Sequence, residues 1–122
     1  MEIFNGYFPQ QYIGSFSASA SGAQYVTGTG FKPNRAIVLC WDTTGTNKNI
    51  SIGLDIVSSR AGMCLYLNGT SSGSNGSNSI YVSRDGSNSM LGQITSFDSG
   101  GCTITFTLTG TCPVSGLVLL MN

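Results

Sequence analysis

Apolar and polar residues alternate with a period of two along much of this chain, and no stretch sustains the period of an amphipathic helix. The alternation is clearest at residues 102–108 (CTITFTL), where the threonines fall on one face of a strand. Clusters of Gly, Asn, Asp and Ser separate such segments. The pattern predicts an all-β chain of about eight to nine short strands, forming an antiparallel β-sandwich or a jelly-roll-like fold. The expected strands cover residues 13–19, 24–27, 36–41, 50–54, 63–67, 80–82, 90–97, 102–108 and 114–121.

Residues 28–41 (GTGFKPNRAIVLCW) combine a tight turn with the most apolar strand of the chain. Gly28 and Gly30 permit backbone angles that other residues avoid, and Pro33 disfavours helix at the residue before it. Residues 36–41 are apolar at every position, which indicates a central strand. Such a strand is covered by the protein on both faces, or by the protein on one face and by a partner on the other.

Two later segments predict more local features. In residues 50–54 the alternation predicts that Ile50, Ile52 and Leu54 are buried, while Gly53 on the opposite face marks a bulge or a close approach. Residues 70–79 carry no apolar side chain, which predicts a solvent-facing loop or a long hairpin tip.

A chain of 122 residues is long enough for one domain with a real core. We expect an N-terminal arm at residues 1–11 and a single β-sandwich domain at residues 12–122. The arm carries apolar and aromatic residues at no steady period, which are the candidate partner-binding residues Ile3, Phe4, Tyr7 and Phe8. They fold back on their own domain or dock on a neighbouring subunit.

Charge is sparse in this chain. Five basic and five acidic residues give a net charge of zero, and charged residues make up 8% of the sequence. This leaves no basic surface for nucleic acid, and the longest apolar run near the end, residues 117–121, is too short to span a membrane. Because a small protein near zero net charge is poorly protected against self-association, we expect contact with copies or partners.

The sequence disfavours enzymatic chemistry. It has no histidine, so a Ser-His-Asp or Cys-His arrangement is excluded. The acidic residues are Glu2, Asp42, Asp55, Asp85 and Asp98, and four of the five sit in or beside turns, where Asp ordinarily bonds local backbone. No dinucleotide or phosphate-loop motif occurs, and we expect no cofactor.

The four cysteines, Cys40, Cys64, Cys102 and Cys112, show no metal-ligand spacing, so we expect no metal site. Cys102 shares the alternating phase of Ile104 and Phe106 and is interpreted as a free thiol in the core. The alternative is a disulfide between Cys102 and Cys112.

Aromatic residues near the polar loops are candidates for glycan binding. Trp41 ends the central strand, and Tyr66 or Tyr81 would supply a second platform for a sugar ring. The alternative interpretation of Trp41 is a core or interface aromatic whose indole N–H is bonded nearby.

The segment 25–38 (YVTGTGFKPNRAIV) resembles a glycine-phenylalanine-x-proline motif that precedes an apolar strand in small β-rich virion proteins of tailed bacteriophages. Residues 51–54 and 96–104 are similar to later strands of that group. The resemblance implies a non-enzymatic structural role in the virion, assembled in the host cytoplasm, often as a homotrimer. The absence of coiled-coil heptads favours a capsid decoration (cement) protein bound to the major capsid protein. The alternative is a tail or fibre module that binds host surface glycans.

Overall fold

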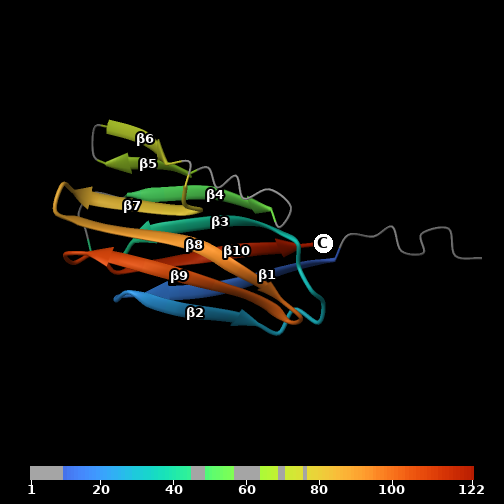
Figure 1. Ribbon diagram of the computed structural model, residues 1–122. Coiled ribbons are helices and arrows are strands. Elements are labelled where there is room, and N and C mark those ends of the chain that lie inside the picture. The colour runs from blue at the N-terminus through green and yellow to red at the C-terminus, as the bar shows by residue number, and fades with distance from the viewer. Residues whose placement is uncertain (1–9, 45–48, 57–63, 69–70, 76) are drawn as a thin grey trace, which may run out of the picture.

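The part of the chain that the structure describes forms ten β-strands and no helix. The computed structural model describes residues 10–44, 49–56, 64–68, 71–75 and 77–122 (Figure 1). The strands are β1 (Gln11–Ala18), β2 (Gly22–Thr27), β3 (Arg35–Asp42), β4 (Ile50–Ile56), β5 (Cys64–Asn68), β6 (Ser71–Asn75), β7 (Ile80–Asp85), β8 (Asn88–Asp98), β9 (Gly101–Thr109) and β10 (Val114–Met121). Nothing among these residues is a helix long and apolar enough to cross a membrane.

The strands make two sheets that lie over one another (Figure 1). One sheet has six strands in the order β1-β10-β3-β4-β5-β6, and the other has four in the order β2-β9-β8-β7. All neighbouring pairs are antiparallel. The predicted all-β sandwich is therefore confirmed. All nine expected strands are present, and β6 adds a further one inside the polar segment that was expected to be a loop or hairpin tip.

The hydrophobic core lies between the two sheets. It is built from every second residue of the strands, because successive side chains of a strand point to opposite faces. Phe16 of β1 meets Phe106 of β9 across the interior, with ring centroids 5.7 Å apart. Fully buried side chains around them include Val38, Val82, Met90, Ile94, Ile104, Val118 and Leu120.

The tight turn predicted before the apolar strand is present at residues 28–34, and it carries the chain from the four-stranded sheet to the six-stranded sheet. Gly28 and Gly30 have φ angles of +93° and +76°, a region that favours glycine. The Thr29 amide donates to the Gly100 carbonyl at 3.1 Å, which ties the turn to the β8–β9 hairpin. The turn then delivers the apolar segment into β3.

Strand β3 is an interior strand of the six-stranded sheet, and the protein covers one of its faces. Ala36, Val38 and Cys40 point into the core and are buried. Ile37 and Leu39 point outward and are 39% and 36% exposed. Among the described residues, none covers this outer face of β3, so of the two alternatives that the sequence left open they do not form the one with protein on both faces.

The prediction for β4 is wrong about which face is inside. Ile52 and Leu54 are 46% and 41% exposed, and Ile50 is half-buried. The buried side of β4 instead carries Ser51, Gly53 and Asp55, which are small or polar.

The physical reason is the segment that enters β7, which crosses the inner side of β4. A Cβ atom at Gly53 would collide with the backbone of Ser79. The Asp55 carboxylate accepts a hydrogen bond from the Ser79 hydroxyl at 2.7 Å, and the Ser51 hydroxyl accepts one from the Tyr81 amide at 3.0 Å. The close approach predicted at Gly53 is therefore confirmed, and it forces the apolar side of β4 outward.

This contact yields a stability prediction. Gly53→Ala is expected to destabilise the fold by about 1–3 kcal/mol, since the new methyl group displaces backbone rather than a flexible side chain. Gly86→Ala is the matched control, because nothing lies within 4 Å of the Cβ position there. Urea denaturation of both variants measures the difference. Equal unfolding free energies would contradict the close packing of Ser79 on Gly53.

Candidate functional site

The outer face of the six-stranded sheet is the most unusual surface of the described residues. Its side chains come from β1, β10, β3 and β4, and antiparallel pairing aligns them in rows across the strands. One row is Leu119, Ile37 and Leu54, and the next is Leu117, Leu39 and Ile52. We call this surface the apolar sheet face and define it by Ile13, Ile37, Leu39, Ile52, Leu54, Ile56, Leu117 and Leu119.

The apolar sheet face is open to solvent in the single chain. Its residues are between 36% and 68% exposed, apart from half-buried Leu119. Soluble monomers rarely leave contiguous apolar patches of this kind uncovered, and such a patch commonly marks an interaction site.

The outer face of the four-stranded sheet has a different character. Thr105 and Thr107 of β9 lie there, with Gln93 of β8 opposite Thr105. Threonine favours a strand and is compatible with water. Leu91 and Tyr81 also lie on this outer face, beside Thr107, so it is mixed in character and more polar than the apolar sheet face.

Polar residues border the apolar sheet face at both ends. Arg35 lies beyond the row of Ile37 and donates through Nη2 to the Asn122 carbonyl at 3.1 Å. Ser17 and Ser115 lie at the other end, in the row of Trp41. Among the outward-facing positions of β1, β10, β3 and β4, Arg35 is the one charged residue. An apolar centre with a polar border is typical of protein interfaces.

A shallow hollow of about 520 Å³ adjoins this border on the side of β1 and β2. Trp41 and Tyr25 line it together with Gln24, and Tyr25 is 70% exposed. The rest of the lining comes from β1 and β10, namely Ser15, Phe16, Ser17, Ser115, Gly116 and Leu117. Aromatic rings beside hydroxyl and amide groups suit a ligand that has both apolar and polar faces.

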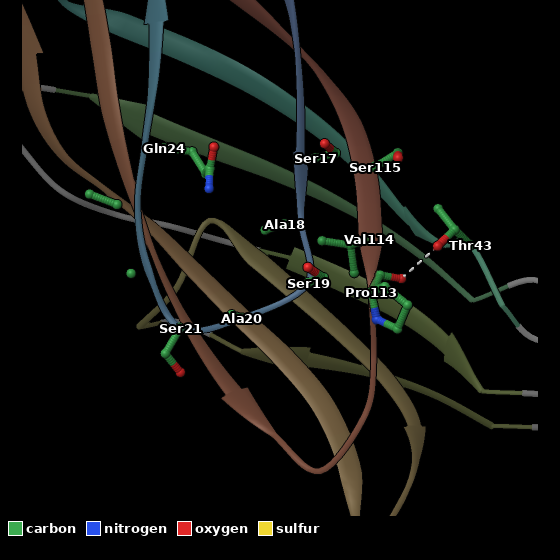
Figure 2. Close-up of a pocket in the computed structure, with 12 residues that line it drawn as sticks. Ser17, Ala18, Ser19, Ala20, Ser21, Gln24, Thr43, Pro113, Val114 and Ser115 are labelled. Atoms are coloured by element: carbon green, nitrogen blue, oxygen red, sulfur yellow. Dashed lines mark hydrogen bonds between the residues drawn. The ribbon is translucent and has the colours of Figure 1, made fainter.

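A second hollow of about 430 Å³ continues from the first around the β1–β2 turn (Figure 2). Ser17, Gln24 and Ser115 line both. The rest of its wall consists of small side chains, including Ser19, Ala20, Ser21, Thr43 and Pro113. Thr43 is held in place because its amide and its hydroxyl both donate to the Pro113 carbonyl, at 3.0 and 3.1 Å.

The candidate residues from the sequence fall in different places. Trp41 is half-buried at the edge of the apolar sheet face, while Tyr81 lies on β7 of the other sheet. The backbone of Tyr66 pairs with Ser51, and its side chain lies outside the described residues. Tyr25 is the aromatic that shares a hollow with Trp41, and sequence reasoning missed it, because only the fold brings β2 beside β1.

The predicted partner-binding residues Ile3, Phe4, Tyr7 and Phe8 also lie outside the described residues. The described chain begins at Gln10, whose carbonyl accepts a hydrogen bond from the Asn122 amide at 3.3 Å. The segment is therefore attached beside the C-terminus of β10.

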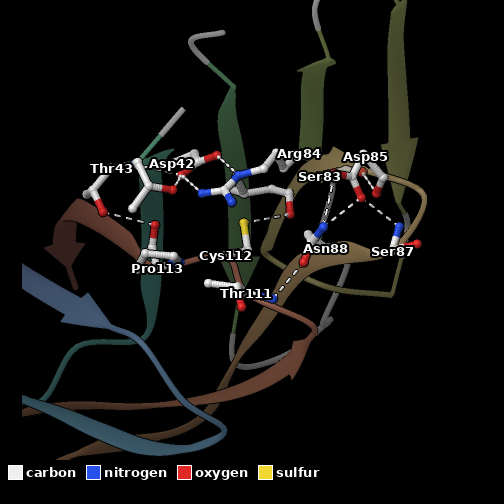
Figure 3. Close-up of polar contacts among 12 residues, drawn as sticks. Asp42, Thr43, Ser83, Arg84, Asp85, Ser87, Asn88, Thr111, Cys112 and Pro113 are labelled. Atoms are coloured by element: carbon white, nitrogen blue, oxygen red, sulfur yellow. Dashed lines mark hydrogen bonds and ion pairs between the residues drawn. The ribbon is translucent and has the colours of Figure 1, made fainter. Parts of the chain in front are cut away.

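Asp42 and Arg84 form an ion pair that joins the two sheets (Figure 3). Arg84 of β7 donates to both carboxylate oxygens of Asp42, at 3.1 and 3.3 Å. The Asp42 side chain is fully buried. Burial opposes its ionisation, but hydrogen bonds from the Thr44 amide and from Arg84 outweigh burial and hold the pKa of this carboxyl below its usual value.

The other described aspartates also accept hydrogen bonds from nearby groups. Asp85 accepts from the Ser87 amide and the Asn88 side chain, and Asp98 from the hydroxyls of Ser96 and Thr103 (Figure 3 shows the Asp85 group). These contacts fix the turns around β8.

Cys40, Cys102 and Cys112 are free and buried, so Cys102 and Cys112 form no disulfide. Burial raises the pKa of the Cys40 and Cys102 thiols to about 12 and that of Cys112 to about 11. They stay protonated near neutral pH and act as small core residues. No group of three metal-ligating side chains occurs within the described ranges.

No known protein family and no curated protein sequence matches this chain. Among solved structures, the tailspike protein of Acinetobacter phage vB_ApiP_P1 is similar, at 12% sequence identity and a TM-score of 0.32. The similarity covers 100% of this chain and 23% of the tailspike chain, so this chain spans less than a quarter of that protein. The function of this chain has to be argued from its own surface.

The Asp42–Arg84 pair gives a pH-dependent prediction. Asp42→Asn is expected to cost about 1–3 kcal/mol at pH 7, because Arg84 loses its charged partner. The pKa of Asp42 is lower in the folded than in the unfolded chain, so its carboxylate stabilises the fold above the unfolded pKa of about 3.9. That contribution is lost as the pH falls through the folded pKa.

Urea denaturation of wild type and Asp42→Asn at pH 7 and at pH values below the unfolded pKa measures this effect. The difference should shrink towards low pH. Asp98→Asn should cost less at pH 7 than Asp42→Asn, because the hydrogen bonds it weakens lie at an exposed turn. A difference that is constant with pH would show that the ionised pair does not stabilise the fold.

Proposed function

We propose that this protein is a non-enzymatic structural subunit of a bacteriophage virion. The observation that carries the proposal is the apolar sheet face, which is open in the single chain. Such a face needs a macromolecular partner, because water is a poor neighbour for two rows in which every position except Ser15 is Ile or Leu. Permanent assembly into a particle supplies that partner. The resemblance of residues 25–38 to a virion-protein motif supports a phage as the source.

The chemistry of the described residues supports a role without catalysis. The buried thiols are protonated, and the described aspartates are engaged in hydrogen bonds that hold turns or join the sheets. The whole sequence also lacks histidine. Among the described residues, a carboxylate acting as a general base would have to be one that the fold already uses.

Within the virion, we place the protein on the capsid as a decoration (cement) protein that stabilises the head. In this proposal the N-terminal residues Ile3, Phe4, Tyr7 and Phe8 bind the major capsid protein. Burying one such side chain contributes roughly 1.5–3 kcal/mol, and an oligomer repeats the contact in every copy. The segment joins the domain at Gln10, beside the C-terminus, so removing it leaves the paired residues of β1 intact.

This proposal predicts that virions of the phage encoding the chain contain it in many copies, measured by quantitative mass spectrometry of purified particles. Deletion of residues 1–9 should abolish addition of the purified protein to capsids that lack it, with an unchanged circular dichroism spectrum. A control variant with Thr107→Ser on the outer face of the four-stranded sheet should bind like the wild type. Purified virions without the protein would overturn the proposal.

A second candidate function is glycan binding by a tail or fibre module, favoured by the hollow that Trp41 and Tyr25 share. An aromatic ring stacks on the apolar face of a sugar, while Gln24 and the neighbouring serines offer groups for its hydroxyls. Because the hollow is shallow and open, it suits a surface glycan better than a small enclosed ligand.

Two matched tyrosine variants test this function. Tyr25→Ala should weaken binding of a bacterial surface glycan about tenfold or more, which corresponds to about 1.4 kcal/mol. Tyr81→Ala removes the same side chain from β7, the strand at the opposite edge of the four-stranded sheet from β2, and should leave binding unchanged. Titration calorimetry with glycans selected on an array measures both. If Tyr81→Ala alone weakens binding, the hollow beside Trp41 is not the glycan site.

A further inference from the structure

We infer that the apolar sheet face is a homo-oligomer interface, in which a second copy of this chain packs its own six-stranded sheet against it. This inference rests on the proposed structural role and names the partner that covers the face. It assigns the surface through which copies associate, whereas the sequence indicated only that association is expected.

The size of the face is suited to a stable interface. Four adjacent strands of seven or eight residues present it. With strands about 4.8 Å apart and a rise of about 3.3 Å per residue, it spans roughly 500 Å² in projection. Its accessible area is larger, because the side chains are corrugated, and a standard interface buries about 800 Å² on each partner. The apolar sheet face therefore approaches the extent of a standard dimer contact, and its border residues can add to the buried area.

The composition of the face favours the same face on a second copy of the chain over a charged or polar partner. Its two central rows, Leu119–Ile37–Leu54 and Leu117–Leu39–Ile52, contain no polar side chain. A partner must then offer an equally apolar and nearly flat surface, and the same face on another copy offers both. The chain has no net charge, so copies approach without long-range repulsion.

The packing required is one that the fold already uses. Inside the subunit, the inner faces of the two sheets pack through interdigitating aliphatic and aromatic side chains. Two outer faces of the six-stranded sheet would pack in the same way, with the row of Leu117, Leu39 and Ile52 at the centre. Arg35 and Ser115 then lie towards the border, where polar groups stay in contact with water.

Leu39→Lys and Ile52→Lys place a charge at the centre of the face, on paired positions of β3 and β4. Thr107→Lys is the control, because it puts the same charge on an exposed position of the other outer face. Light scattering and native mass spectrometry over a wide concentration range measure the mass. Wild type and Thr107→Lys should form a closed dimer of the 12.7 kDa chain.

Each lysine variant on the face should weaken association at least about thirtyfold, which corresponds to about 2 kcal/mol. Circular dichroism checks that the variants fold, and the milder Leu117→Ser and Ile52→Ser serve if either lysine variant does not. A wild-type protein that stays monomeric, or folded face variants that associate as well as wild type, would overturn the inference. Binding of the monomeric wild type to phosphatidylcholine vesicles or to empty capsids through this face would also overturn it.

The two proposals fail separately. A monomer that is nevertheless present in virions overturns the homo-oligomer interface and leaves the structural role standing. An oligomer that is absent from virions supports the interface and overturns the virion role.

Discussion

A two-layer sandwich covers one face of each sheet, and the central strand of this protein is apolar on both. Val38 and Cys40 fill the core, while Ile37 and Leu39 alternate with them and point outward. Strand β4 also presents large apolar residues outward, but for a different reason. Ser79 occupies its inner side at Gly53, so only the outer side has room for large apolar groups. The open apolar face follows from this constraint, and it is the surface for which we propose a partner.

Periodicity in the sequence predicts which residues share a face, but it does not predict which face is inside. The strands and the sandwich were therefore predicted correctly, whereas the buried side of β4 was not. Ile52 and Leu54 are the largest apolar residues of that strand and lie outside, since the polar tie from Asp55 to Ser79 takes the inner side. Strand β6 was missed because its residues have low strand propensity and pair with β5 through the backbone.

The candidate site was predictable only where it depends on one strand. Trp41 could be named as a candidate because it ends the apolar run of residues 36–41, and in the structure it lines a hollow. Its neighbour Tyr25 comes from a strand of the other sheet, and no spacing in the sequence indicates that contact. The pairing of Asp42 with Arg84 likewise depends on how the two sheets stack. From the sequence, both residues were interpreted as parts of turns, whereas in the fold they form an ion pair between the sheets.

The central claim is that one outer face of the sandwich is covered by another copy and the other meets water. Solution NMR with a neutral gadolinium chelate tests it directly, by measuring the paramagnetic relaxation of methyl groups on the intact wild-type protein. The methyl groups of Ile37, Leu39 and Ile52 should be protected, while those of Thr105 and Thr107 should relax strongly. Equal relaxation on both outer faces would contradict the account.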